Sequence, residues 1–241
     1  MGVMAENGAD PEFVLATGDV HHFEGVRSVN DPLWMTNYEL IYSHPELMID
    51  WFPLLGNHEY RGNTQAVQDY SNVSRRWTMP ARYYTKTFAD KDMTIRVVWI
   101  DTAPLIDKYR NEKETYPDAC KQDYQQQLAW IDSVLTSAKE DWIIVAGHHP
   151  FMPKLPKTRV NVWICKHVST RYSASTKWIC TSAGISTTSS TSAYRAAISI
   201  ISPIPPVHSA ARSNPLKALC FAALHPASPL YLPIKKLWNC A

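Results

Sequence analysis

Short apolar runs followed by polar, glycine-containing loops recur along the first 150 residues of the chain. Residues 13–16, 51–55 and 142–145 are such runs, and their length predicts strands that are buried in a sheet. Each run leads into a loop in which a glycine is followed directly by Asp, Asn or His. Open α/β folds place their chemistry at the carboxyl ends of strands, so these loops are the first candidates for a functional site.

The segments between these runs carry helical and hairpin patterns. A capping Asn-Asp and a helix-start proline open a predicted helix over 30–43, and 63–77 has apolar residues on one helical face. The clearest helical pattern covers 121–139, and 83–88 with 94–101 predicts an antiparallel strand pair. Strands that alternate with helices predict a layered α/β domain.

The three loops supply the residue types of a metal site. They read Thr17-Gly18-Asp19-Val20-His21-His22, Leu55-Gly56-Asn57-His58-Glu59 and Ala146-Gly147-His148-His149-Pro150. A carboxylate, an amide and imidazoles form a mixed oxygen and nitrogen site, which suits Fe, Zn or Mn rather than a metal selected by thiolates. Two such ions, about 3.5–4 Å apart, can clamp the attacking and leaving oxygens of a displacement at phosphorus.

Each loop alone has a simpler interpretation. A single Gly-Asp after a strand is usually a turn. Asn57-His58 alone could be an ordinary loop, and His148-His149 alone could be satisfied polar residues at a strand end. The ordered set of three loops is what favours a metal site.

This ordered set resembles the calcineurin-like metallophosphoesterases, and among them the small purple, tartrate-resistant type of acid phosphatase. The resemblance also rests on Phe23-Glu24-Gly25-Val26, Ile100-Asp101-Thr102, the stretch 71–77 before Met79-Pro80, and Tyr83-Tyr84. It implies an αββα sandwich with a dinuclear site at its edge, holding Fe together with Zn, Mn or a second Fe. It also implies a small phosphomonoester as the substrate, with neither nucleic acid nor a membrane as a partner.

The resemblance assigns metal-binding roles residue by residue. Asp19 would be the carboxylate that bridges the two ions, and Asn57 and His148 would bind the second ion. His22 stands where the purple enzymes carry the tyrosinate that colours their iron, so the purple colour and the ferric ion are in doubt. His21 is expected to be a loop residue without a ligand role.

Catalytic roles follow from the same resemblance. His58 would polarise the phosphoryl oxygen or protonate the leaving alkoxide. Glu59 would orient His58 through a hydrogen bond, and His149 would face the substrate.

The charge of the chain changes abruptly after Pro150. Residues 1–150 hold all 22 acidic residues and 13 Lys and Arg, a net charge of −9, whereas 151–241 hold 11 Lys and Arg and no acidic residue. The second segment is also rich in Ser, Thr and Pro. Such a composition is typical of a disordered basic arm, which could bind nucleic acid, or of a glycosylated stalk.

A change of reading frame explains this transition better. If the last base of each codon is read with the first two of the next across 178–192, permitted codons spell Asp-Met-Tyr-Ile-Cys-Gly-His-Ile-His-Asn-Phe-Gln-His-Ile. Gly-His-x-His is the last metal-binding motif of the resembled family, and the same shift across 152–166 restores acidic residues. We therefore interpret 1–150 as a partial metallophosphoesterase domain and 151–241 as an out-of-frame basic tail.

Other expectations concern the ends of the chain and its location. The resembled family has a first strand with an Asp or Asp-x-His motif, which we expect upstream of 1–8. No signal-like stretch begins the chain and no run of about 18 apolar residues could span a membrane, so the sequence gives no signal for the location of the protein. Only Cys120 lies in the first 150 residues, and we predict no disulfide framework.

We expect metal-dependent hydrolysis of phosphomonoesters for the intact relative and impaired activity for this chain. The alternatives are an inactive truncated fragment, a basic-tailed binding protein, or another calcineurin-like phosphodiesterase or nucleotidase. Oligomeric state has no signal in the sequence.

Overall fold

The computed structural model describes residues 11–90 and 93–149, together with the backbone of strands at 177–183, 196–201 and 230–231. The two ends, 1–10 and 232–241, and the remaining segments lie outside the described residues. The expected position of a first strand upstream of 1–8 therefore lies outside them as well.

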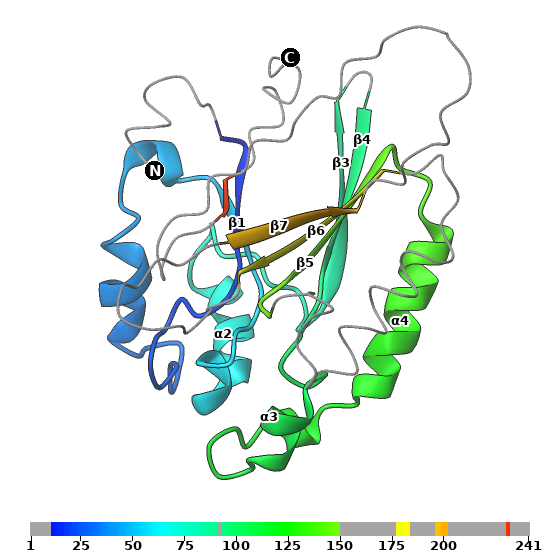
Figure 1. Ribbon diagram of the computed structural model, residues 1–241. Helices are drawn as coiled ribbons and strands as arrows, with labels where there is room; N and C mark the ends of the chain where they lie inside the picture. Colours follow the sequence, from blue (N-terminus) through cyan, green and yellow to red (C-terminus); the bar gives the residue numbers. More distant parts are fainter. Residues whose placement is uncertain (1–10, 91–92, 150–176, 184–195, 202–229, 232–241) are drawn as a thin grey trace, which may run out of the picture.

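The strands form two sheets (Figure 1). The smaller sheet has β1 (Phe13–Ala16) at its centre, parallel to β2 (Asp50–Pro53) and antiparallel to β8 (Leu230–Tyr231). The 13–16 run is thus a strand, as its apolar character predicts, and the 51–55 run is a strand as far as Pro53. Every residue of β1 is buried.

The larger sheet has the order β3-β4-β5-β6-β7. Its first three strands are β3 (Tyr84–Asp90), β4 (Met93–Trp99) and β5 (Trp142–Gly147), where β3 and β4 form the expected antiparallel pair and β5 lies parallel to β4. Strand β6 (Lys177–Ala183) continues the sheet parallel to β5, and β7 (Ala196–Ile201) closes it antiparallel to β6.

Side chains of β4 and β5 alternate between two apolar clusters, as strand geometry requires. Trp99 and Ile144 pack with Phe13 and Phe52 of the smaller sheet. The residues on the opposite face, Val98, Ile100, Ile143 and Val145, pack with residues of the helix α4. The two sheets therefore face each other, and α4 covers the far side of the larger one (Figure 1).

Helix α4 (Tyr124–Ser137) is the long helix predicted over 121–139. The Oδ1 atom of Asp123 caps it by accepting a hydrogen bond from the backbone N–H of Gln126 at 3.0 Å. Ile131 and Leu135 form its buried stripe. Together with the two sheets and the helices beyond the smaller one, α4 completes the layered α/β sandwich that we predicted.

The helices beside the smaller sheet are shorter than the sequence predicts. The pattern over 30–43 becomes a single π-helical segment, η2 (Met35–Glu39), and the pattern over 63–77 becomes α2 (Thr64–Asp69) followed by a 3₁₀ turn, η5 (Tyr70–Asn72). The reason lies in residues 76–78, which pair with the edge of β2. The N–H of Trp51 donates to the carbonyl of Arg76 at 2.6 Å, and the N–H of Thr78 donates to that of Trp51 at 2.8 Å.

An aromatic cluster fills the space between these helices and β2. Trp34 stacks on Tyr70 with ring centroids 3.5 Å apart, and Trp77 packs edge-on against Trp34 at 5.2 Å. Buried Arg76 forms an ion pair with Glu39 at 2.7 Å and donates to the carbonyl of Tyr42 at 2.6 Å, so its charge is compensated inside the cluster. These tertiary contacts override the local helical preference.

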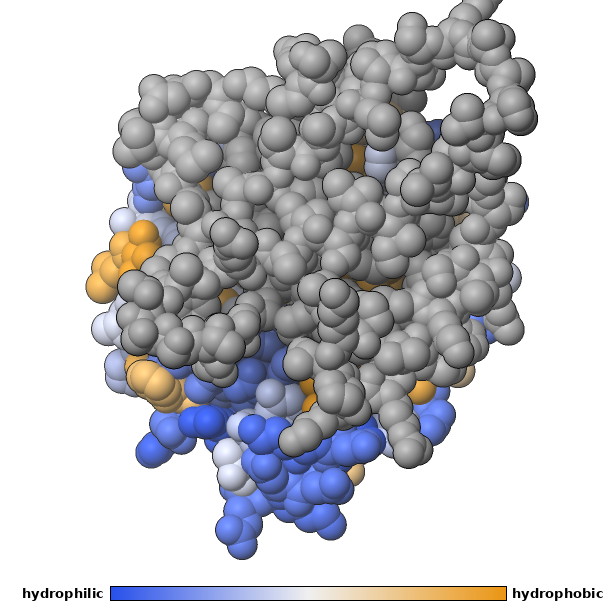
Figure 2. All heavy atoms as spheres, in the orientation of Figure 1, coloured by the Kyte–Doolittle hydropathy of each residue, from blue (hydrophilic) through white to orange (hydrophobic). Residues whose placement is uncertain are grey.

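Exposed apolar and hydrophilic side chains lie on different parts of the described surface. Exposed apolar side chains gather on η2 and the residues after it, namely Met35, Leu40, Ile41 and Met48. Figure 2 shows apolar patches along the left edge of the view, where Figure 1 places these elements, and a hydrophilic surface at the bottom around the short helix α3 (Asp107–Asn111). Within the part of the chain that the structure describes, no helix is long and apolar enough to cross a membrane.

Candidate metal centre

The carboxylate of Glu59 ties two of the three loops together. It accepts hydrogen bonds from the backbone N–H groups of Asp19 at 2.8 Å, His21 at 3.1 Å and Gly56 at 2.8 Å. Its side chain is buried, and burial together with the charge of Asp19 raises the pKa of Glu59, although these backbone donors oppose the rise. Glu59 therefore organises the backbone around Asp19, and its expected role in orienting His58 stays a prediction.

Two glycines allow the loops to touch. Gly18 has a φ of +85°, and a Cβ atom there would lie 2.7 Å from the backbone nitrogen of Gly56. A Cβ atom on Gly56 would lie 2.2 Å from the Oδ1 atom of Asp19. Only glycine fits at both positions, because the Asp19 carboxylate and the second loop occupy that space.

Asp19 lies at the centre of the site. It has a φ of 55°, a left-handed conformation that costs about 1–3 kcal/mol in a non-glycine residue and often marks a functional position. Its Oδ1 atom accepts the backbone N–H of His58 at 3.0 Å. Its Oδ2 atom is buried and has no hydrogen bond of good geometry from the described residues.

His148, at the end of β5, contacts this Oδ2 atom. Its Nε2 atom lies 3.1 Å from Oδ2 of Asp19, and its Nδ1 atom lies 2.8 Å from the carbonyl oxygen of Thr17. Burial lowers the pKa of His148, but the charge of Asp19 outweighs it and brings the pKa to about 9. Burial conversely opposes ionisation of Asp19, and the charge of His148 still holds the pKa of Asp19 well below its usual value.

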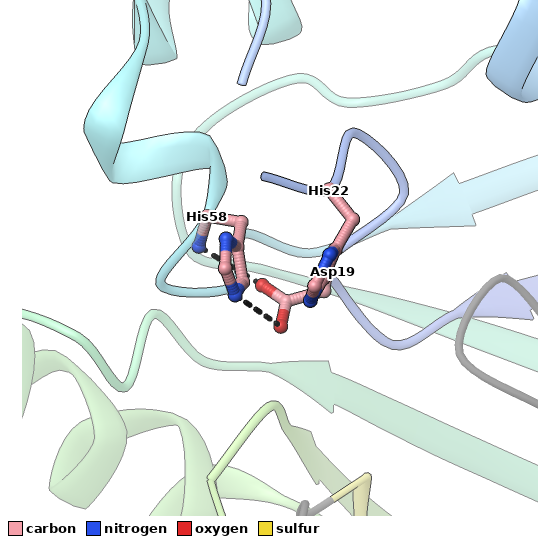
Figure 3. A group of neighbouring side chains, drawn as sticks. All are labelled: Asp19, His22 and His58. Carbon is pink, nitrogen blue, oxygen red and sulfur yellow. Dashed lines mark hydrogen bonds and ion pairs between the residues drawn. The ribbon is translucent and has the colours of Figure 1, made fainter. Parts of the chain in front are cut away.

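His22 and His58 approach the same carboxylate (Figure 3). Their ring centroids lie 3.8 Å apart, and the Nε2 atom of His58 lies 3.9 Å from Oδ2 of Asp19. The Nδ1 atom of His58 lies 2.6 Å from the carbonyl oxygen of Phe23, which therefore orients the ring. Burial and the neighbouring charge of His58 lower the pKa of His22.

The donor set fits a metal ion. One ligand atom each from Asp19, His22 and His58 lies within 4.8 Å of the others, and His148 contacts the same carboxylate. A buried carboxylate oxygen surrounded by imidazole nitrogens suits zinc or a similar first-row ion. Asn57 directly precedes His58, and its side chain is partly exposed.

His149 follows His148 and contacts two hydroxyl groups. Its Nδ1 atom lies 2.7 Å from the hydroxyl of Thr102, and its Nε2 atom lies 2.9 Å from the hydroxyl of Tyr109. Burial holds the pKa of His149 well below its usual value. Both ring nitrogens thus contact protein hydroxyl groups, which link His149 to α3 and to Thr102. The expected position of His149 facing the substrate stays a prediction.

Several groups around the centre could not be inferred from residue spacing. The carbonyls of Thr17 and Phe23 orient two imidazoles, but a backbone group leaves no mark in the sequence. His21 is fully buried and packs edge-on against Trp34 at 4.3 Å, and burial lowers its pKa to about 4. It is a neutral residue of the core.

A second buried carboxylate lies behind the loops. The hydroxyl of Tyr60 donates to the Oδ2 atom of Asp101, and Arg82 approaches that hydroxyl at 3.4 Å. Burial raises the pKa of Asp101 to about 7, although the Tyr60 hydrogen bond and the Arg82 charge oppose the rise. In the motif Ile100-Asp101-Thr102, Asp101 therefore accepts a hydrogen bond from Tyr60, and Thr102 contacts His149.

A carboxylate and three imidazoles thus gather at the carboxyl ends of sheet strands in a layered α/β domain. The chain belongs to the calcineurin-like phosphoesterase family, whose family model matches residues 4–169. This match confirms the family and the fold that the motifs indicated.

Curated relatives agree with this assignment. Tartrate-resistant acid phosphatase type 5 of pig (Sus scrofa) is 31% identical over 181 residues, which cover 66% of this chain and 53% of that protein. The human (Homo sapiens) protein is 33% identical over 149 residues, 59% of this chain and 45% of its own. Purple acid phosphatase 7 of Arabidopsis thaliana is 30% identical over 155 residues, 62% and 46% of the two chains. The chain spans about half the length of these relatives.

Among solved structures, the chain matches one described as "GAP50 the anchor in the inner membrane complex of Plasmodium". The identity is 23% and the TM-score 0.47, and the match covers 66% of this chain and 52% of the other.

Proposed function

We propose that the protein with its reading frame restored after Pro150, called here the uninterrupted form, hydrolyses phosphomonoesters with the help of two metal ions bound around Asp19. The observation that carries the proposal is the buried Oδ2 atom of Asp19, which lacks a hydrogen bond of good geometry from the described residues and lies 3.1 Å from Nε2 of His148. Relatives named as acid phosphatases favour a monoester as the substrate.

In this proposal four residues hold the ions. Asp19, His22, Asn57 and His148 would hold them, and Fe with Zn, Mn or a second Fe are the candidate metals. When bound, the ions would activate water and share the charge that develops at phosphorus.

His58 is the residue proposed to act on the substrate. The carbonyl of Phe23 accepts from its Nδ1 atom at 2.6 Å, which directs Nε2 toward the space beside Asp19. An imidazole in this position can polarise a phosphoryl oxygen or protonate a leaving alkoxide. Glu59 supports the site by holding the Asp19 loop and the Gly56 loop in contact.

The position of β6 supports the change of reading frame as the cause of an impaired chain. Strand β6 lies parallel to β5, with Ser182 opposite Gly147. In the shifted frame Gly-His-x-His arises from the codons of 183–187, directly after this strand ends, whereas residues 184–195 lie outside the described part of the chain. Neighbouring parallel strands end at the same edge of a sheet, so the restored histidines would come close to His148.

Nucleotide sequence across the Pro150 codon tests the frame directly. The functional test restores one base after that codon in the gene and assays the product on aryl monophosphates and diesters with metal. We expect metal-dependent cleavage of the monoester by the repaired protein and negligible cleavage by the 241-residue chain. Cleavage of diesters alone would favour a phosphodiesterase, and an inactive repaired protein would favour a non-enzymatic product.

A further inference from the structure

His22 and His58 surround the Asp19 carboxylate in a way that suggests a ligand set of their own (Figure 3). One ligand atom from each of the three residues lies within 4.8 Å of the other two. This set differs from the four ligands proposed for the uninterrupted protein, because it includes His58 and needs no residue beyond 149.

The separation of His58 from Asp19 is too long for a hydrogen bond but suits an intervening ion. Nε2 of His58 lies 3.9 Å from Oδ2 of Asp19, whereas N–H···O hydrogen bonds measure about 2.7–3.2 Å. An ion bound at about 2.0–2.2 Å from each atom would fit between them with little movement of either side chain.

The other ring nitrogen of His58 has the partner that metal-binding histidines usually have. Its Nδ1 atom lies 2.6 Å from the carbonyl oxygen of Phe23. A carbonyl can only accept, so Nδ1 carries the proton and the lone pair of a neutral ring lies on Nε2. A backbone carbonyl on the far nitrogen is a common outer contact of histidines that bind metal.

The Asp19 oxygen provides a second indication of a ligand. Asp19 is 4% exposed. Apart from Nε2 of His148 at 3.1 Å, no described residue offers its Oδ2 atom a close polar partner, and no contact to this atom has good hydrogen-bond geometry. Two imidazole rings, inclined at 36° to each other, also lie beside it with their centroids 3.8 Å apart. A divalent cation would satisfy this oxygen and the lone pairs of both rings at once.

We propose that the 241-residue chain binds a single divalent ion of the zinc class through Asp19, His22 and His58. His148 remains beside the same carboxylate. Bound in this way, Nε2 of His58 is withdrawn from any substrate, so the chain is metallated yet catalytically silent. The consequence for catalysis rests on the function proposed above, whereas the binding site itself does not.

Cobalt titration of the metal-free chain tests the proposal without an activity assay, because Co²⁺ with nitrogen and oxygen ligands in a tetrahedral site absorbs in the visible range. Calorimetry with Zn²⁺ gives the stoichiometry. We expect saturation at about one equivalent, and a loss of affinity of roughly tenfold or more in His58→Ala and in His22→Ala. The His22 side chain is partly exposed, so His22→Ala remains informative if His58→Ala does not fold.

His44→Asn is the matched control. His44 lies outside the cluster and caps the 3₁₀ turn η3 (Pro45–Leu47) by accepting from Glu46, a role that Asn can fill. Its affinity should equal that of the unaltered chain. Saturation at two equivalents, no binding, or unchanged affinity in His58→Ala and His22→Ala would overturn the proposal. None of these results depends on hydrolysis, so the repaired protein is judged separately by its own assay.

Discussion

The Nε2 atom of His148 lies 3.1 Å from the Oδ2 atom of Asp19. This contact joins the end of β5 in the larger sheet to the loop after β1 in the smaller one. The metal centre therefore lies where the two sheets meet at the carboxyl ends of their strands, and its geometry depends on how the loops are held together.

Glu59→Gln should destabilise the fold. The Oε2 atom of Glu59 accepts from Asp19 and Gly56, and Oε1 accepts from His21. The single oxygen of a glutamine can accept from two of these N–H groups, but its NH₂ group then faces the third. That buried N–H donor is left unpaired, at a cost of about 1–3 kcal/mol. Urea unfolding monitored by circular dichroism measures this change.

Glu114→Gln is the control for this substitution, since Glu114 is exposed. Its free energy of unfolding should change by no more than about 0.5 kcal/mol. Equal stability of the two variants would show that the three backbone contacts of Glu59 contribute little.

Gly56→Ala should displace the Asp19 loop in the candidate metal centre. The new methyl group would lie 2.2 Å from Oδ1 and 2.6 Å from the backbone nitrogen of Asp19, so the Asp19 loop must move. Overpacking of this kind costs about 1–3 kcal/mol, and Co²⁺ affinity should fall along with stability. A variant with unchanged Co²⁺ affinity would show that the two loops are not in close contact.

Asp101→Asn should remove a pH dependence of stability. The pKa of Asp101 rises to about 7 in the folded protein, because burial disfavours its charge. The folded state then holds a proton that the unfolded state releases above the ordinary aspartate pKa of 3.8. This stabilisation is complete below that value and is lost as pH rises toward 7.

Unfolding free energies at pH 5, 6, 7 and 8 measure the effect. The unaltered chain should lose stability across this range, and Asp101→Asn should show a flatter profile. Asp50→Asn, at an exposed position, should keep the slope of the unaltered chain. Parallel profiles for all three proteins would show that Asp101 does not titrate in this range.

Strand-forming sequence was sufficient to predict the positions of β1, β2 and β5, because a buried strand needs an uninterrupted apolar run. Helix α4 was predictable for a related reason, since Ile131 and Leu135 repeat on one face and Asp123 provides the cap. The lengths of the helices near β2 were not predictable. The carbonyl of Arg76 accepts a hydrogen bond from the N–H of Trp51 in β2, so this segment pairs with the strand instead of continuing a helix.

The site was predictable to the level of residue types but not of contacts. Glycine followed by Asp, Asn or His after a strand located Asp19, His58 and His148. The partners of Glu59 are backbone N–H groups, and His149 is engaged by Thr102 and Tyr109. Such partners depend on the packing of distant segments, which residue spacing does not encode.

The last prediction separates ligands from catalytic residues in the repaired protein. If the restored Gly-His-x-His completes the two metal shells, His58 is free to act on the substrate there, in contrast to its proposed role in the 241-residue chain. Asn57→Ala and His148→Ala should then lose metal and activity together, since each removes a ligand. His58→Ala should keep both ions and lose roughly 10²–10⁴-fold in turnover, the usual contribution of a positioned acid–base group.

Metal analysis and aryl phosphate hydrolysis of the same preparations measure the two properties, with His44→Asn as the control. Loss of metal from His58→Ala in this background would show that His58 is a ligand in both forms of the protein.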